Sequence, residues 1–291
     1  MKHGSSCVVL LAVAVLAGCS TDKKADAAQP TARKAGSVAP RPSVVETPSQ
    51  PYRATTVTGG AKLTGTIDFD GQIPRDSIIQ LPPETLGCGH SVTARFVEHT
   101  GTRIAGAVVW IADIRAGKPL PAARRFELAN NQCLLTPRVQ AVVAPATLNM
   151  ASQDAAMHRN HIIDVATGEL AAIAPFNDNG EVVPFDKLLV KPAQLEISCE
   201  QHPWSKAWIL AFDHPYFAVS EKAGSFSIED IPAGTYQVKA WHPRLGVAEQ
   251  TLTVSAGQAA SVALKLAGAA PAGPAPPHTA PDSVAQDTSG K

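Results

Sequence analysis

The sequence has no excess of charge of either sign, since 25 Lys and Arg residues balance 25 Asp and Glu residues in a chain of 291. Nucleic-acid-binding domains usually carry a clustered basic surface, so we expect no nucleic-acid partner. The sequence also lacks a Gly-x-Ser-x-Gly nucleophile elbow, a His-Glu-x-x-His motif and a phosphate-binding loop. These absences favour a protein that is not an enzyme.

Long apolar runs are absent after residue 19, and no segment has a helical period over several turns. Short apolar stretches occur instead, separated by Gly, Pro and Asp-Gly turn signals about every 8–12 residues. The stretches expected to form strands are 63–69, 107–112, 139–143, 147–150, 195–199, 208–212, 236–240 and 262–264. This pattern predicts an all-β protein built from one or two sandwiches.

The N-terminus has the features of an export signal. A positively charged start is followed by the short apolar run Val8–Leu16. Residues Leu16–Cys19 resemble the lipobox of bacterial lipoproteins, which implies cleavage before Cys19 and lipid attachment to it. Ser20 follows, where Asp would indicate retention in the inner membrane. We therefore expect a periplasmic protein anchored by lipid to the outer membrane; an ordinary signal peptide is the alternative.

Two segments have little hydrophobic content. Residues 19–57, rich in Ala, Pro, Ser and Thr, predict a disordered tether, and residues 268–291 predict a disordered tail. The folded part should lie between them and is long enough for two small domains or one large sandwich.

Cysteine count indicates one disulfide. If Cys7 leaves with the signal and Cys19 carries lipid, Cys88, Cys133 and Cys199 remain. An oxidising periplasm should pair two of them and leave one free. Cys88 and Cys133 lie in turn-like contexts suited to a disulfide, whereas Cys199 ends an apolar strand, which favours Cys199 as the free thiol. A Cys133–Cys199 bridge, or a buried inert thiol, is the alternative.

The stretch around Cys199 combines a thiol with an imidazole. His202 follows three residues after Cys199, and a thiolate and an imidazole held at a loop suit copper or zinc. A C-x2-H pair is a weak signal by itself. An earlier segment offers two further imidazoles, His158 and His161.

Five short motifs occur in an order that resembles cupredoxin-like, plastocyanin-related secreted proteins, some of which are labelled methylamine-utilisation proteins. The motifs are Cys133–Val139, Asp154–His161, Cys199–Trp204, Asp213–Phe217 and Trp241–Gly246. The resemblance extends over roughly residues 62–266 and implies a cupredoxin-like Greek-key sandwich, with residues 126–216 forming that domain.

The resemblance implies that His158, Cys199 and His202 form the His2Cys set of a blue-copper centre, with copper as cofactor. The usual axial methionine is missing, because its position is occupied by Ser205. The axial position could be taken by water, a backbone carbonyl or Met157, or stay open. His161 should lie on the opposite face of its strand, as an outer or surface residue.

A second resemblance covers the C-terminal part. Residues 217–220, 224–228 and 231–236 are similar to the carboxypeptidase regulatory-like, transthyretin-type sandwich, whose first strand is supplied here by 63–71, far upstream. We expect residues 63–75 to pair with the segment 217–267, and residues 58–125 to provide the N-terminal strands.

Two functions follow from these resemblances. The first is a copper protein that passes electrons, or copper, to a periplasmic redox or copper-handling partner. Zinc or an adventitious metal is an alternative occupant of the same site. The second is a non-enzymatic envelope scaffold, whose cupredoxin-like site has lost its metal. The absent axial methionine favours the second, and the presence of all three ligands favours the first.

Overall fold

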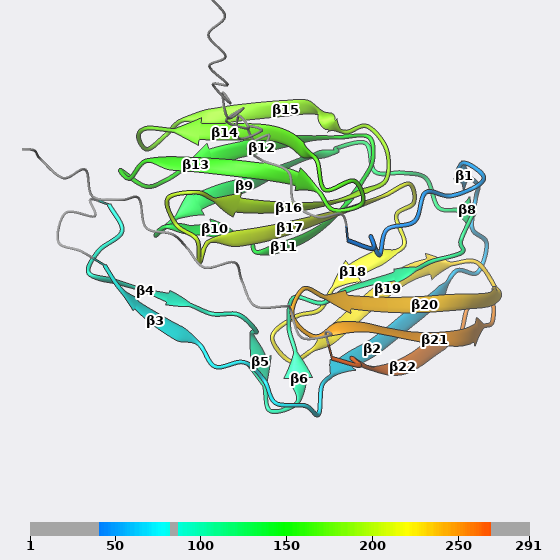
Figure 1. Ribbon diagram of the computed structural model, residues 1–291. Coiled ribbons are helices and arrows are strands. Elements are labelled where there is room, and N and C mark those ends of the chain that lie inside the picture. The colour runs from blue at the N-terminus through cyan, green and yellow to red at the C-terminus, as the bar shows by residue number, and fades with distance from the viewer. Residues whose placement is uncertain (1–40, 82–86, 269–291) are drawn as a thin grey trace, which may run out of the picture. The chain divides into compact units, whose positions relative to one another are not determined.

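The computed structural model describes residues 41–81 and 87–268 (Figure 1). In these ranges the chain forms β-strands and no helix, which confirms the expected all-β class. No helix in the described part of the chain has the length and hydropathy that a bilayer span requires. The signal segment 1–18, the lipidation site Cys19, the tether up to residue 40 and the tail 269–291 lie outside the described residues.

The first sandwich consists of two sheets around one core. Its four-stranded sheet has the order β10 (Leu134–Thr136), β9 (Arg125–Asn131), β12 (Ala146–Ser152) and β15 (Val182–Leu189). Its five-stranded sheet has the order β11 (Val139–Val143), β17 (Lys206–Phe212), β16 (Ala193–Cys199), β13 (His158–Asp164) and β14 (Leu170–Phe176). Leu148 of one sheet and Ile162 and Ile197 of the other are fully buried in the shared core.

The second sandwich is built from both ends of the described chain. One sheet has the order β18 (Phe217–Val219), β7 (Val108–Ile111), β20 (Gly234–His242) and β21 (Gly246–Val254). The other has β19 (Ser225–Ile231), β2 (Ala61–Asp68), β6 (Arg103–Ile104) and β5 (His99–Thr100), with β22 (Ala259–Lys265) also paired to β2.

Strand β2 joins the beginning of the sandwich to its end. It runs antiparallel to β19 and parallel to β22. Residues 61–68 are therefore paired with two strands from the C-terminal part of the chain. The chain leaves this sandwich after β7, forms the first sandwich, and returns at β18.

Strand β7 is buried on both faces, as its continuous apolar run predicts. Val109 and Ile111 face the core of the second sandwich. Val108 and Trp110 belong to a separate cluster that includes Trp208 and Leu210 of β17 and Trp241 of β20. This cluster packs strands of the two sandwiches against each other and is separate from both cores.

Residues 41–57 are packed against the folded chain, although composition places them in the tether. Val45 is buried in the cluster of β7 and β17, and the Val44 amide donates to Gln194 Oε1 at 2.9 Å. The short strand β1 (Arg53–Ala54) pairs with β8 (Ala116–Gly117). Two valines without periodicity cannot be recognised in a sequence as a packed segment, because only the tertiary structure supplies the surface that they cover.

A further two-stranded sheet lies outside the sandwiches. It consists of β3 (Ser77–Gln80) and β4 (Ser91–Ala94), and Cys88 lies between these two strands, shortly before β4 (Figure 1). The disulfide between Cys88 and Cys133 connects the segment of this small sheet to the turn between β9 and β10.

Candidate metal centre

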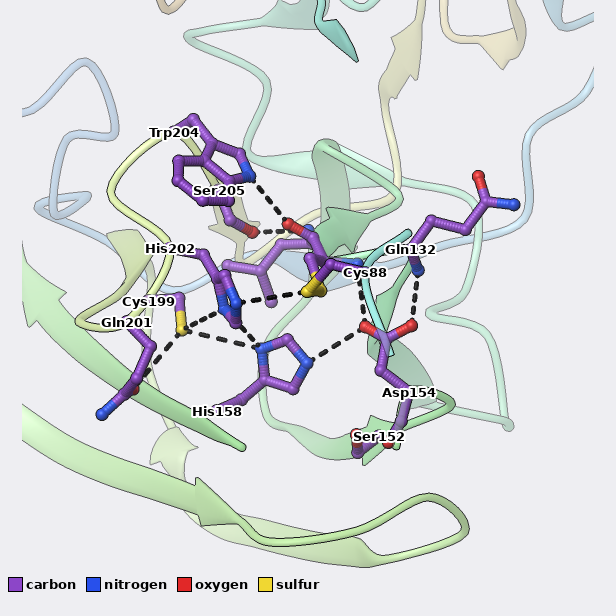
Figure 2. Close-up of a disulfide and its surroundings, with 12 residues drawn as sticks. Cys88, Gln132, Ser152, Asp154, His158, Cys199, Gln201, His202, Trp204 and Ser205 are labelled. Carbon is purple, nitrogen blue, oxygen red and sulfur yellow. Dashed lines mark hydrogen bonds and ion pairs between the residues drawn. A yellow bond between two sulfur atoms is a disulfide. The ribbon is translucent and has the colours of Figure 1, made fainter. Parts of the chain in front are cut away.

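The three residues expected to bind metal come together at one end of the five-stranded sheet (Figure 2). His158 begins β13 and Cys199 ends β16, and these neighbouring strands pair in antiparallel register, with Asn160 opposite Cys199. The loop after β16 turns back at once, because the Ser205 amide donates to His202 O at 2.8 Å and the Cys199 amide donates to Ser205 O at 3.2 Å. This turn brings His202 beside Cys199.

The three side chains are buried and their donor atoms face one another. Cys199 Sγ lies 3.7 Å from His158 Nδ1 and 3.4 Å from His202 Nδ1, and the two Nδ1 atoms are 3.1 Å apart. The residues are 3%, 0% and 4% exposed, respectively. The arrangement is a triangle of one sulfur and two nitrogens, which is the shape of a trigonal His2Cys site.

The size of this triangle fits a metal ion. Bonds of about 2.0 Å to nitrogen and 2.3 Å to sulfur in a trigonal plane separate two nitrogens by about 3.5 Å and a nitrogen from the sulfur by about 3.7 Å. The observed edges lie within about 0.4 Å of these values. The three side chains therefore need to move only slightly to bind a metal ion.

Burial sets the protonation of the three groups. Burial and the neighbouring His158 together lower the pKa of His202 to about 4. Burial also lowers the pKa of His158, against an opposing effect of Asp154. Burial raises the pKa of the Cys199 thiol, while backbone hydrogen bonds oppose the shift. At neutral pH both imidazoles are neutral with a free lone pair, and metal binding must displace the thiol proton.

Asp154 orients His158 and braces the adjacent turn. Its Oδ2 lies 3.0 Å from His158 Nε2, so Nε2 carries the hydrogen and Nδ1 presents its lone pair to Cys199 and His202. The same carboxylate accepts the amide hydrogens of Gln132 at 2.6 Å and Cys133 at 2.9 Å. Both residues have left-handed φ angles, 52° and 55°, in the turn between β9 and β10. Asp154 lies in one of the five sequence motifs, but nothing in the sequence indicates this role.

The disulfide and Trp204 cover the other side of His202 (Figure 2). Cys88 and Cys133 are bonded to each other, and Cys199 is free. Cys88 Sγ lies 3.4 Å from His202 Nε2, while the Trp204 ring meets the imidazole edge-on at 5.3 Å between centroids. Trp204 Nε1 also donates to Cys133 O at 3.1 Å. Other clusters of metal-ligand type here use Cys88 or Cys133, whose sulfurs the disulfide already occupies.

The residues expected at the axial or outer positions of the site either make other contacts or are exposed to solvent. Ser205 Oγ accepts the Leu135 amide hydrogen at 2.8 Å, and the Met157 side chain is 58% exposed. His161 Nε2 lies 3.2 Å from Glu200 Oε2, and the His161 side chain is 28% exposed. An oxygen that the sequence did not suggest is Gln201 Oε1, 3.8 Å from Cys199 Sγ. An amide oxygen is one of the weak axial donors that His2Cys sites use.

Comparisons with known proteins give short or distant similarities. Residues 202–262 match the family profile of polysaccharide lyase family 4, domain II. No curated protein matches the chain. Among solved structures, an amicyanin variant with Cu(I) covers 31% of this chain and 85% of its own, with 14% identity and a TM-score of 0.27.

Two further structures show the same level of similarity. A copper-containing nitrite reductase from Thermus scotoductus SA-01 covers 35% of this chain and 24% of its own, at 21% identity and a TM-score of 0.27. A purple cupredoxin from Nitrosopumilus maritimus covers 29% of this chain and 97% of its own, at 14% identity and a TM-score of 0.25. TM-scores this low assign no function, so the case for a metal rests on the side chains described above. The profile of the lyase domain overlaps the segment 217–267, for which the carboxypeptidase regulatory-like resemblance stays a prediction.

Replacing Asp154 with asparagine should weaken metal binding and destabilise the fold. The amide keeps the size of the side chain, but it removes the charge opposite His158 and one of the acceptors for the turn amides. We expect copper affinity to fall by roughly 10- to 100-fold. The free energy of unfolding should fall by about 1–3 kcal/mol. Competition with a chromophoric chelator and urea unfolding measure the two effects.

Asp178 supplies the matched control for this change. It is an exposed aspartate in the turn before β15. Asp178→Asn should leave both quantities near those of the unchanged protein. Equal copper affinity in Asp154→Asn and the unchanged protein would show that His158 needs no carboxylate partner.

Proposed function

We propose that this chain binds one copper ion through His158, Cys199 and His202 and serves in electron transfer. The observation that carries the proposal is the buried triangle of Sγ and two Nδ1 atoms, with edges of 3.1–3.7 Å. Soft thiolate and imidazole donors in a trigonal arrangement are the set that suits copper in both of its oxidation states. When bound, copper would supply a one-electron redox couple.

The chain's own residues perform the supporting tasks. Asp154 holds His158 in the tautomer that presents Nδ1. Cys199 gives up its thiol proton on binding, and the disulfide and Trp204 keep water from His202. Two of the three ligands lie on hydrogen-bonded neighbouring strands, so the site should change little between oxidation states. This rigidity and burial favour electron transfer over delivery of the ion to another protein.

The proposal includes a location and a partner. The motif at Leu16–Cys19 supports lipid attachment and an outer-membrane anchor, and the Cys88–Cys133 disulfide supports an oxidising compartment such as the periplasm. The partner would be a periplasmic redox protein, with copper-handling proteins as the alternative class. No catalytic activity is part of this proposal.

Titration of the purified protein with Cu(II) tests the proposal. One equivalent should produce a visible thiolate-to-copper charge-transfer band and protect the Cys199 thiol from alkylation. Zn(II) in a parallel titration should protect the thiol without colour. A chain that shows no band and no thiol protection with Cu(II) is a metal-free scaffold, and the copper proposal would then fail.

A further inference from the structure

A cavity of about 560 Å³ is lined by Trp204, whose ring also contacts His202. Residues of both sandwiches line it, among them Phe96, Leu135, Arg138 and His242. Its volume falls in the range of sites for small molecules, which are mostly apolar with a few polar groups that orient the ligand. The metal proposal does not use this cavity.

The inner wall of the cavity holds a guanidinium without a carboxylate partner. Arg138 lies over the rings of Trp208 and Phe96, with its guanidinium carbon 5.2 and 5.9 Å from the ring centres. One of its N–H groups donates to Arg95 O. Among the described residues no Asp or Glu forms an ion pair with Arg138. A guanidinium has five N–H donors, so most of them stay available.

A second guanidinium, that of Arg244, lies against the lining residue Phe96 and does not itself line the cavity. Arg244 lies over the Phe96 ring at 4.6 Å, and it too forms no ion pair with a described carboxylate. Burial and repulsion from Arg244 together lower the pKa of Arg138 to about 10, against the opposing attraction of Asp76, which forms its ion pair with Arg95. Arg138 nonetheless stays charged at neutral pH. A half-buried charge of this kind is costly unless a counter-charge accompanies it.

His242 adds a neutral donor to the same wall. It is 4% exposed, and burial lowers its pKa to about 3. Its Nδ1 accepts the Arg244 amide hydrogen at 3.2 Å, so Nε2 carries the ring hydrogen. Nε2 donates to no group in the described part of the chain.

The other charged residues around the cavity are paired or exposed. Arg95 pairs with Asp76 and Lys206 with Glu196, both at 3.1 Å. Glu98, Glu221 and Lys222 line the cavity too, but all three are exposed. The rim is thus mixed in charge, while the interior combines a cation and a donor with apolar surface from Phe96, Leu135 and Trp204.

We propose that this cavity binds a small organic carboxylate, with the carboxylate held by Arg138 and His242 and an apolar ring packed against Phe96 and Trp204. A guanidinium recognises a carboxylate through two parallel N–H donors, which explains the choice of carboxylate. The apolar walls explain the choice of a ring-bearing ligand over an inorganic anion. The proposal does not depend on copper at the neighbouring site.

Benzoate is a suitable probe for the full chain. Calorimetric titration should show benzoate binding, and benzamide, the neutral molecule of the same shape, should bind at least 10-fold more weakly. Sulfate should also bind more weakly, because it has no ring. Equal binding of benzoate and benzamide, tighter or equal binding of sulfate, or no benzoate binding would each overturn the proposal.

Substitution of the guanidinium tests the assigned residue. Arg138→Gln should weaken benzoate binding by roughly 10- to 100-fold. Arg138→Lys, which keeps the charge without the paired donors, should give an intermediate loss. Arg125→Gln is the matched control, because Arg125 is exposed on β9 and does not line the cavity. Benzoate binding that Arg138→Gln leaves unchanged in a folded protein would overturn the assignment.

A copper-free variant separates this proposal from the metal proposal. Cys199→Ser should bind benzoate as tightly as the unchanged protein, whatever its metal affinity. Loss of benzoate binding in Cys199→Ser would contradict an independent site.

Discussion

Replacing Cys199 with serine should abolish the thiolate-to-copper absorption band and reduce copper affinity by more than 100-fold. The serine hydroxyl stays protonated and is a poor ligand for copper, whereas the thiolate is the one sulfur donor in the triangle. Loss of a hydrogen-bond partner outside the ligand set already costs roughly 10- to 100-fold, so loss of a direct ligand should cost more. Absorption spectroscopy and competition with a chelator measure the change.

His161 provides the control for this substitution. It lies on the same strand as His158, three residues further along, and contacts Glu200 at the surface. His161→Gln should keep the band and the affinity, whereas His202→Gln should lose both. Retention of the band in Cys199→Ser would show that another group binds copper and would contradict the ligand assignment.

Removal of the disulfide should have the largest effect on stability. Cys88 and Cys133 are 45 residues apart. Closing a loop of this length lowers the conformational entropy of the unfolded chain, which stabilises the folded protein by about 4 kcal/mol. We expect the double variant Cys88→Ala, Cys133→Ala to lose about that much free energy of unfolding. Urea unfolding followed by circular dichroism measures the loss.

The same variant should bind copper more weakly. Cys133 contributes its amide to Asp154, which orients His158, and Cys88 lies against His202 Nε2. Loosening of this turn should let both imidazoles move, so affinity should fall together with stability. The unchanged protein in a dithiol reductant should reproduce the loss of stability. Equal unfolding midpoints for the oxidised protein and the double variant would show that the disulfide does not stabilise the fold.

The strand pattern was predictable where one residue type repeated along the chain. The apolar run at Val108–Ile111 indicated a strand buried on both faces, and the structure packs it between two clusters. Residues 41–57 contain no such repetition. Their packing against β17 and β7 depends on a surface that forms only when distant strands come together.

The three candidate ligands differ in how far the sequence by itself could group them. Cys199 and His202 are three residues apart, so a short loop can bring them together. His158 precedes Cys199 by 41 residues, and only the resemblance to cupredoxin-like proteins joined it to them. The structure brings these side chains together because β13 and β16 are hydrogen-bonded neighbours.

The residues that contact the candidate ligands could not be assigned these roles from the sequence. Asp154 contacts a turn 21 and 22 residues before it, and Gln201 turns its amide oxygen toward Cys199. Such contacts depend on side-chain directions that no spacing specifies. The cavity beside Trp204 depends likewise on two sandwiches whose lining residues are far apart in the chain.

By itself, the sequence determined the all-β class, through its short apolar stretches and frequent turns, and it contained the donor atoms that a copper site requires. Only the tertiary structure decided which cysteines pair, which imidazole nitrogens face the free thiol, and what covers His202. The physical reason is that local patterns record which residues are buried, whereas a binding site depends on distances between residues that the chain brings together by strand pairing and sheet packing.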